Sequence, residues 1–264
     1  MLGSVFSKTI REQRRALLWW AIGLVAACLL TTAFYPSIHE NAASFRRLLD
    51  SLPEGLRKAF GEDFASPAGY LQARLFSIFA PVLFLVFAIG AGSRAIAGEE
   101  EHKTLDLLLS TPVPRRRVLL DMASAMLVMA AGLGVVLAIA IAASGPPFEL
   151  TVSIANVASA VADCVLLAIA FGAIALAVGA GTGRRSVAIG LTAGIAAGSY
   201  LIDILALSVN GLGWLQHLSP FFYYREADPI AHGLDPLDAA VLAAIAIVAT
   251  GIAVAAFERR DLAA

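Results

Sequence analysis

Six long apolar runs alternate with shorter polar stretches along this chain of 264 residues. The runs cover residues 16–35, 75–97, 118–143, 154–180, 187–209 and 237–257. A helix of about 20 apolar residues crosses the ~30 Å hydrocarbon layer of a bilayer. None of the six runs has the charged face that a helix of a soluble bundle would show. The pattern therefore predicts an all-α polytopic membrane protein with one transmembrane domain of six spans, residues 1–264.

The composition agrees, because 59% of the residues are hydrophobic and 15% are charged, against about 25% charged in soluble domains. Both cysteines, Cys28 and Cys164, lie within apolar runs, so no disulfide framework is indicated. Twelve lysines and arginines lie in the two terminal segments and in the loops around residues 98–117 and 181–186, against six on the opposite side. By the positive-inside rule, both termini and residues 98–117 are expected in the cytoplasm.

Two outer segments have their own patterns. Residues 36–74 mix apolar and charged positions at helical spacing, which predicts one or two amphipathic helices on the outer surface or against a partner. Residues 210–236 are rich in aromatic side chains, which concentrate at the level of the lipid headgroups. We expect that second segment to be interfacial or partly re-entrant.

The cytoplasmic loop, residues 98–117, reads GEEEHKTLDLLLSTPVPRRR. Between Glu99 and Ser110 it has no Gly or Pro, which predicts a helix of about three turns with three glutamates in its first turn. Pro112 and Pro114 would end it. Its apolar stripe consists of Leu105, Leu108 and Leu109. Two interpretations stay open: the stripe could rest in the lipid headgroups, or it could dock into the groove of a partner.

This loop closely resembles the cytoplasmic loop after the second span in permease subunits of type 2 ABC exporters, with its acidic start, leucine run, Ser/Thr-Pro and Arg cluster. The end of the chain, LSPFFYYREADPIAHGLDPLDAAVLAAIAIVATGIAVAAFERRDL, looks like the last outer loop, sixth span and short tail of that family. Two separate motifs and the topology agree, so the resemblance covers nearly the whole chain. The outer loop of residues 36–74 is longer than in the plainest members, which leaves its role open.

The resemblance implies an export subunit in a bacterial-type inner membrane, paired with a second copy of itself or a homologous permease. Two cytoplasmic ATPase subunits would bind ATP and magnesium, and this chain would bind no cofactor. The loop would be a coupling helix docked on the ATPase through Glu99, Glu100, Lys103, Thr104, Leu105, Leu107 and Leu108. An amphipathic elbow helix before the first span, with Phe6, Ile10 and Arg14, would lie on the inner membrane surface and touch the same partner.

Catalytic motifs are not evident. The glycine-rich GAGTGRRS, residues 179–186, follows an apolar helix, has Arg184 where a P-loop needs Lys, and has the wrong spacing. The four histidines have no metal-ligand spacing, and no basic, aromatic-interleaved patch suits nucleic acid. We therefore expect no enzyme activity in this subunit. An intramembrane enzyme and an ATP-independent secondary transporter are the alternatives, but paired catalytic residues and an internal repeat are both lacking.

Two acids fall inside predicted spans. Asp163 lies in the fourth and Asp203 in the fifth, both in the outer half. An ionisable group in hydrocarbon costs at least ~2.5 kcal/mol, so such a residue faces a bundle interior or a wet cavity. Either acid could contact cargo or a proton on the transport path, or could bond to a neighbouring helix. The sequence does not name the cargo.

Overall fold

The computed structural model describes residues 5–40, 66–104, 113–148, 150–208, 213–226 and 229–260, and these ranges are helical without any strand. Six described stretches are long and apolar enough to cross a membrane: Val5–Ser37, Pro67–Glu101, Arg115–Ser144, Ile154–Thr182, Arg185–Ala206 and Pro236–Arg259. The predicted all-α architecture with six potential spans is confirmed. The predicted amphipathic helices of the outer loop fall mostly on residues 41–65, outside the described residues.

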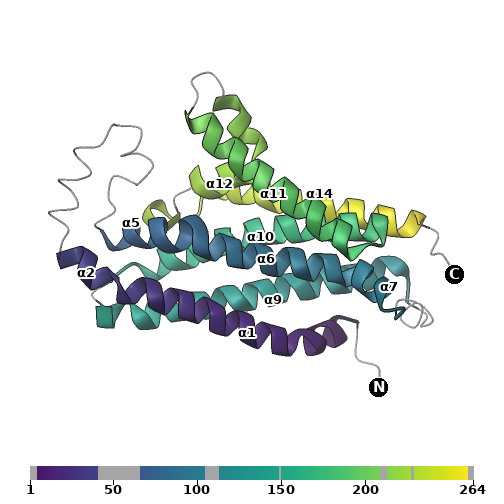
Figure 1. The fold of residues 1–264 in the computed structure, drawn as a ribbon, viewed down its shortest axis with the longest axis horizontal. Helices are drawn as coiled ribbons and strands as arrows, with labels where there is room; N and C mark the ends of the chain where they lie inside the picture. Colours follow the sequence, from purple (N-terminus) through teal and green to yellow (C-terminus); the bar gives the residue numbers. More distant parts are fainter. Residues whose placement is uncertain are drawn as a thin grey trace.

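Two of these stretches are built from more than one helical element (Figure 1). The first is α1 (Val5–Ala33) with α2 (Tyr35–Glu40), and the second is α5 (Pro67–Leu71), η1 (Gln72–Phe79), α6 (Ala80–Ser93), η2 (Arg94–Gly98) and α7 (Glu99–Glu101). Then follow α9 (Arg115–Ser144), η3 (Pro146–Phe148), α10 (Ile154–Thr182), α11 (Arg185–Ser208), η4 (Gly213–Leu218), α12 (Pro220–Glu226), α13 (Pro229–His232) and α14 (Pro236–Arg259).

Helix α10 is the centre of the molecule and the most deeply buried of the six spans. It contacts α6, α9, α11 and α14, and the main apolar core lies along it. Helix α1 packs on α9 at the periphery. The start of α1 and the end of α14 lie at the same end of the bundle (Figure 1), as an even number of spans requires.

Helices α6 and α10 approach closely because glycines face each other where they cross. A Cβ atom on Gly92 would lie 2.1 Å from the carbonyl oxygen of Gly172, and one on Gly172 would lie 2.7 Å from the sulfur of Met126. Two backbones can approach this closely only when no side chain stands between them. The crossing fixes α6 to the buried centre of the fold.

The helical stretch that contains the predicted second span, residues 75–97, begins at Pro67, and residues 72–79 within it form a π-helix. The amide of Ala80 bonds to the carbonyl of Leu75, five residues back. Pro81 has no N–H, so the carbonyl of Phe76 lacks the next donor in this register. The hydroxyl of Tyr224, from α12, donates to that carbonyl at 2.6 Å. A residue of the outer segment thus completes the backbone bonding of the second span.

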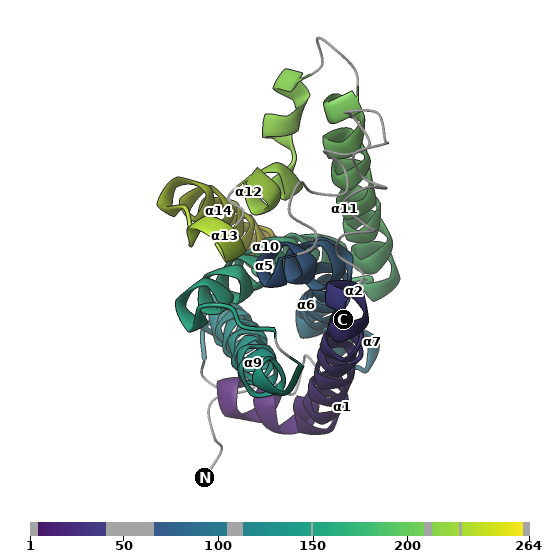
Figure 2. The ribbon, with the colours of Figure 1, turned by 90° about the vertical axis from the view of Figure 1, so that its left-hand side faces the viewer.

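Between α11 and α14 the chain folds back in short helices, of which α12 packs against α10, α11 and α14. Phe221 and Tyr224 of α12 are buried, and the ring of Phe221 contacts those of Phe171 and Tyr200. Helix α11 itself leans away from the other spans toward its C-terminal end (Figures 1 and 2). Helix α12 therefore lies in the wedge that opens between α11 and the rest of the bundle.

Candidate functional site

The three glutamates of residues 98–117 end a helix instead of beginning one, which corrects the predicted helix start at Glu99. They form α7, the continuation of the second span. Residues 105–110 of that predicted helix lie outside the described residues. Lys103 has a positive φ of 56°, its amide bonds to the carbonyl of Glu100, and the amide of Thr104 bonds to the carbonyl of Glu99. This bonding is a Schellman motif, which closes the helix. The prediction failed because the absence of Gly and Pro does not show where a preceding helix stops.

A carboxylate at a helix C-terminus interacts unfavourably with the helix dipole, so these glutamates need cations or hydrogen-bond donors as partners. Glu99 has two: the ammonium of Lys8, from α1, lies 3.2 Å from its carboxylate, and the hydroxyl of Thr104 donates to it at 2.6 Å. The contact between Lys8 and Glu99 ties the start of α1 to the end of the second span, 91 positions away in sequence.

Glu100 and Glu101 join two further helix ends. The guanidinium of Arg260, just after α14, pairs with Glu100 and also donates to the carbonyl of Ala180 at 3.3 Å, near the end of α10. The carboxylate of Glu101 accepts the backbone N–H of Arg185 at 3.0 Å, at the start of α11. We call Lys8, Glu99, Glu100, Glu101, Arg185 and Arg260 the charged clamp.

Gly183 is the residue that lets the clamp close over the turn between α10 and α11. It caps α10 with a φ of +65°, in the left-handed region, and a Cβ there would lie 2.1 Å from Nη2 of Arg260. The glycine-rich residues 179–186 therefore comprise the end of α10, a tight turn at Gly183 and Arg184 beneath Arg260, and the start of α11. Arg115, at the start of α9, donates to the carbonyl of Arg260 at 2.9 Å, so all the spans meet at this end.

The predicted docking residues divide into three groups in the structure. Glu99, Glu100 and Thr104 are engaged within the chain, as described above. Lys103 is exposed at the turn. The rest of the predicted set, Leu105, Leu107 and Leu108, lies outside the described residues. The clamp therefore anchors the first residues of the loop, and their contact with a partner stays a prediction.

The predicted elbow residues lie on α1, which runs without a break from the N-terminal segment into the first span. Figure 2 shows that the first turns of α1 run across the direction of the rest of the helix. Phe6 and Ile10 pack against the apolar core, and Arg14 is exposed. The segment thus has the amphipathic character expected of an elbow, with its apolar side toward this chain.

Asp203 is paired inside the chain. Its carboxylate accepts two hydrogen bonds from Arg225 of α12, from Nε at 3.0 Å and from Nη2 at 3.1 Å. The side chain of Asp203 is 3% exposed and that of Arg225 is 39% exposed. The pair holds the outer segment against α11, which is the helix-bonding alternative considered for an acid in a span.

Asp163 is different. It is fully buried on α10, and neither carboxylate oxygen has a hydrogen-bond partner within the described part of the chain. A buried polar group without a partner is costly, and its retention needs a reason. Of the two acids predicted for the transport path, Asp163 is therefore the one with unused bonding capacity.

Sequence reasoning missed Arg260 and Arg225 as site residues. Both were counted only as loop cations for the positive-inside rule, because their partners lie 160 and 22 positions away in the chain. Each occurs in a motif that had been singled out, FERRDL and PFFYYRE. Within the described residues, no group of three or more His, Cys, Asp or Glu side chains could hold a metal ion.

An apolar groove separates η1 and α6 from α11. It has a volume of 240 Å³ and is lined by residues of both spans, among them Ile78, Val82 and Ala197, with Phe221 from the outer segment. Beside it, α11 exposes large apolar side chains, including Leu191, Leu201 and Leu205. This side of the molecule is apolar and lacks cover from the described chain.

Comparison with known proteins agrees with this architecture. The model of one family, described as the ABC-2 family transporter protein, matches residues 4–262. A comparison with curated proteins found no match. The family match covers almost the entire chain and confirms the resemblance seen in the loop and the tail. The chain therefore belongs to the ABC-2 transporter family, as a multi-pass membrane permease of an ABC transporter and not as its ATPase.

Proposed function

We propose that this permease forms the membrane pathway of an ATP-driven exporter, as a dimer whose halves are each coupled to a cytoplasmic ATPase subunit. ATP and magnesium would bind only to those partner subunits. The observation that carries the proposal is the family match over residues 4–262. We also propose a bacterial-type inner membrane with cytoplasmic termini, which the excess of cations at the end of the molecule where the clamp lies supports.

The charged clamp supports coupling to an ATPase. It connects the start of the cytoplasmic loop to the ends of α1, α10, α11 and α14. A force on residues 105–112 would therefore reach most spans directly and would not bend one loop alone. Coupling further requires that an ATPase contacts this loop differently in its two nucleotide states.

The glycines of α11 support a dimer. Gly190, Gly194 and Gly198 are spaced by four residues, on one face of the helix, and a Cβ at any of them would meet nothing within 4 Å. In contrast to Gly92, these glycines thus face no close neighbour in the described part of the chain. A small-residue face of this kind allows a second helix to approach closely. We assign it, with the groove between α6 and α11, to a second permease subunit.

The path for cargo would run along this interface. Asp163 stays a proposed contact on the path, because its oxygens are unpaired. We propose that Asp203 instead positions the outer segment through Arg225.

Co-purification tests the coupling to an ATPase. The permease is isolated from its native membrane in mild detergent, as wild type and as the Leu105→Glu, Leu108→Glu double variant. We expect a soluble ATPase to accompany the wild type and to be lost from the double variant. Arg259→Glu is the matched control: it changes the net charge by the same two units at the same end, on an exposed side chain. If no ATPase accompanies the wild type, the alternatives of a secondary transporter and an intramembrane enzyme replace this proposal.

The oligomeric mass of the same preparations tests the dimer. Gly194→Leu adds a side chain in open space, so the subunit should fold, but the dimer should dissociate. Gly23→Leu, also in open space but on α1, should leave the mass unchanged. A dimer that survives Gly194→Leu would exclude this face of α11 as the interface.

A further inference from the structure

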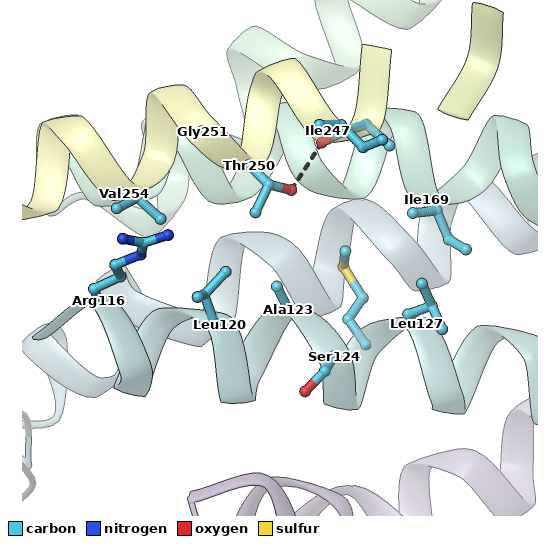
Figure 3. A pocket seen from close by; sticks show the side chains of 12 residues that line it. Arg116, Leu120, Ala123, Ser124, Leu127, Ile169, Ile247, Thr250, Gly251 and Val254 are labelled. Carbon is cyan, nitrogen blue, oxygen red and sulfur yellow. Dashed lines mark hydrogen bonds between the residues drawn. The ribbon is translucent and has the colours of Figure 1, made fainter. Parts of the chain in front are cut away.

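A lateral groove lies between α9 and α14, on the other side of α10 from α11 (Figure 2). It has a volume of 600 Å³, and Ile169 of α10 contributes to its lining. Figure 3 shows side chains of α9 and α14 facing each other across it, with Arg116 at one end. Large apolar residues at its rim are exposed, among them Leu127 at 49% and Ile247 at 71%. The groove opens sideways, at the depth of the spans.

The length of the groove matches one leaflet. From Arg116 to Leu127 the helix rises about 16 Å, half of a hydrocarbon layer of ~30 Å. Arg116 belongs to the first turn of α9, at the end of the bundle that carries the charged clamp. The groove therefore extends from the membrane surface to about the midplane.

Among the polar side chains of the lining, one has no hydrogen-bond partner in the described part of the chain. The hydroxyls of Ser124 and Thr250 donate to carbonyls of their own helices, at 2.9 and 2.8 Å. Arg116 is the only charged residue of the lining, and its side chain makes no hydrogen bond or ion pair within the described part of the chain. Its neighbour Arg115 is already bonded to the carbonyl of Arg260. An apolar slot with a free guanidinium at the membrane surface complements an acyl chain attached to a phosphate.

We propose that this groove binds an anionic phospholipid of the leaflet on the side of the termini, with one acyl chain along α9 and α14 and the phosphate on Arg116. An apolar slot that opens into lipid is filled by acyl chains and not by water. Anionic headgroups are favoured because Arg116 is flanked by two further arginines, which add a positive surface field. A lipid held here would brace α14 against α9, where the two spans are separated by the groove.

Native mass spectrometry of the full chain in mild detergent tests the proposal, with dioleoyl phosphatidylglycerol and dioleoyl phosphatidylcholine as probes. We expect one phosphatidylglycerol per chain, bound more tightly than phosphatidylcholine. Arg116→Gln should weaken phosphatidylglycerol binding about tenfold and abolish the preference, as expected for a lost charge-assisted hydrogen bond. Arg117→Gln, which removes the same charge from the same turn outside the groove, should change affinity less than about twofold.

A second variant pair tests the apolar part of the site. Gly251 lines the groove, and a Cβ there meets nothing within 4 Å, so Gly251→Leu fills the slot without a clash. It should weaken binding of both lipids, whereas Gly132→Leu, exposed elsewhere on α9, should not. Equal losses with Arg116→Gln and Arg117→Gln, or unchanged binding with Gly251→Leu, would overturn the proposal. A change of oligomeric mass with Gly251→Leu would overturn it too, in favour of an interface between copies.

Discussion

The crossing of α6 and α10 makes a sharp prediction, because two glycines of α6 lie in opposite environments. At Gly92 a Cβ would lie 2.1 Å from the oxygen and 3.0 Å from the carbon of the Gly172 carbonyl, and 3.2 Å from the amide nitrogen of Leu176. All three atoms are backbone, so no side-chain rotation relieves the contact. Ordinary contact begins at 3.4 Å, so Gly92→Ala requires α6 and α10 to separate by roughly 1.3 Å locally.

Overpacking of this kind costs about 1–3 kcal/mol, and α10 is the helix that most of the core shares. With a loss of about 2 kcal/mol, the midpoint of thermal unfolding of a chain this size should fall by about 4–8 °C. Gly90→Ala adds the same methyl group two residues earlier, where nothing lies within 4 Å, and should leave the midpoint unchanged or raise it slightly. Gly172→Ala should fall between them, because its closest contact is the flexible side chain of Met126.

The two free cysteines report this unfolding directly. Cys28 of α1 and Cys164 of α10 are both fully buried, so a thiol-reactive dye should become fluorescent only when the bundle opens. Wild type and variants are heated at one scan rate in the same detergent, since such transitions are often irreversible. A Gly92→Ala protein with the midpoint of Gly90→Ala would refute the close crossing of the two backbones.

The same melting assay checks three further predictions. Asp203→Asn should destabilise the protein by about 2 kcal/mol. This is less than the loss of a fully buried ion pair would cost, because Arg225 is partly exposed. Asp163→Asn should be tolerated, since no hydrogen bond is lost. Tyr224→Phe leaves a buried carbonyl of the π-helix without a donor and should cost about 1–3 kcal/mol, whereas an unchanged midpoint would mean that the carbonyl finds another donor. Lys8→Glu should lower the midpoint, and adding Glu99→Lys should restore it in part. If the double variant is no better than Lys8→Glu alone, the two charges do not interact.

The spans could be predicted from sequence because burial in a bilayer requires only length and apolarity, which are properties of one continuous segment. The departures from regular α-helix, such as the π-helix, could not be predicted from the sequence. The π-helix of residues 72–79 includes Gln72 and Arg74, whose polarity hid it, and its stability depends on Tyr224 from a distant segment. Hydropathy contains no information on such long-range bonds, so it did not show that this helical stretch begins at Pro67, before the predicted span.

The loop shows a different failure. The glutamates were selected from the family pattern, and their position at the end of a span came from long-range partners that no local rule reveals. Their charge is unfavourable at a helix C-terminus, and long-range partners explain why three acids lie there: Lys8 for Glu99, Arg260 for Glu100 and the backbone N–H of Arg185 for Glu101. The helix-dipole rule placed the glutamates at a helix start, because carboxylates stabilise the first turn of an isolated helix.

The two acids of the spans had the same sequence signal, and their environments separate them. Asp203 carries a full complement of charge-assisted bonds with Arg225, so its charge already has a structural role in closing the wedge between α11 and the bundle. Asp163 is as deeply buried, on the helix that the other spans share, and it makes no such bond within the described residues. Packing gains nothing from a carboxylate there, since an apolar side chain would avoid the cost of burying it. The cost of keeping an acid at this position is therefore an argument for a contact that arises outside the isolated subunit, with cargo or with a proton, and it makes Asp163 the first residue to vary once a cargo is known.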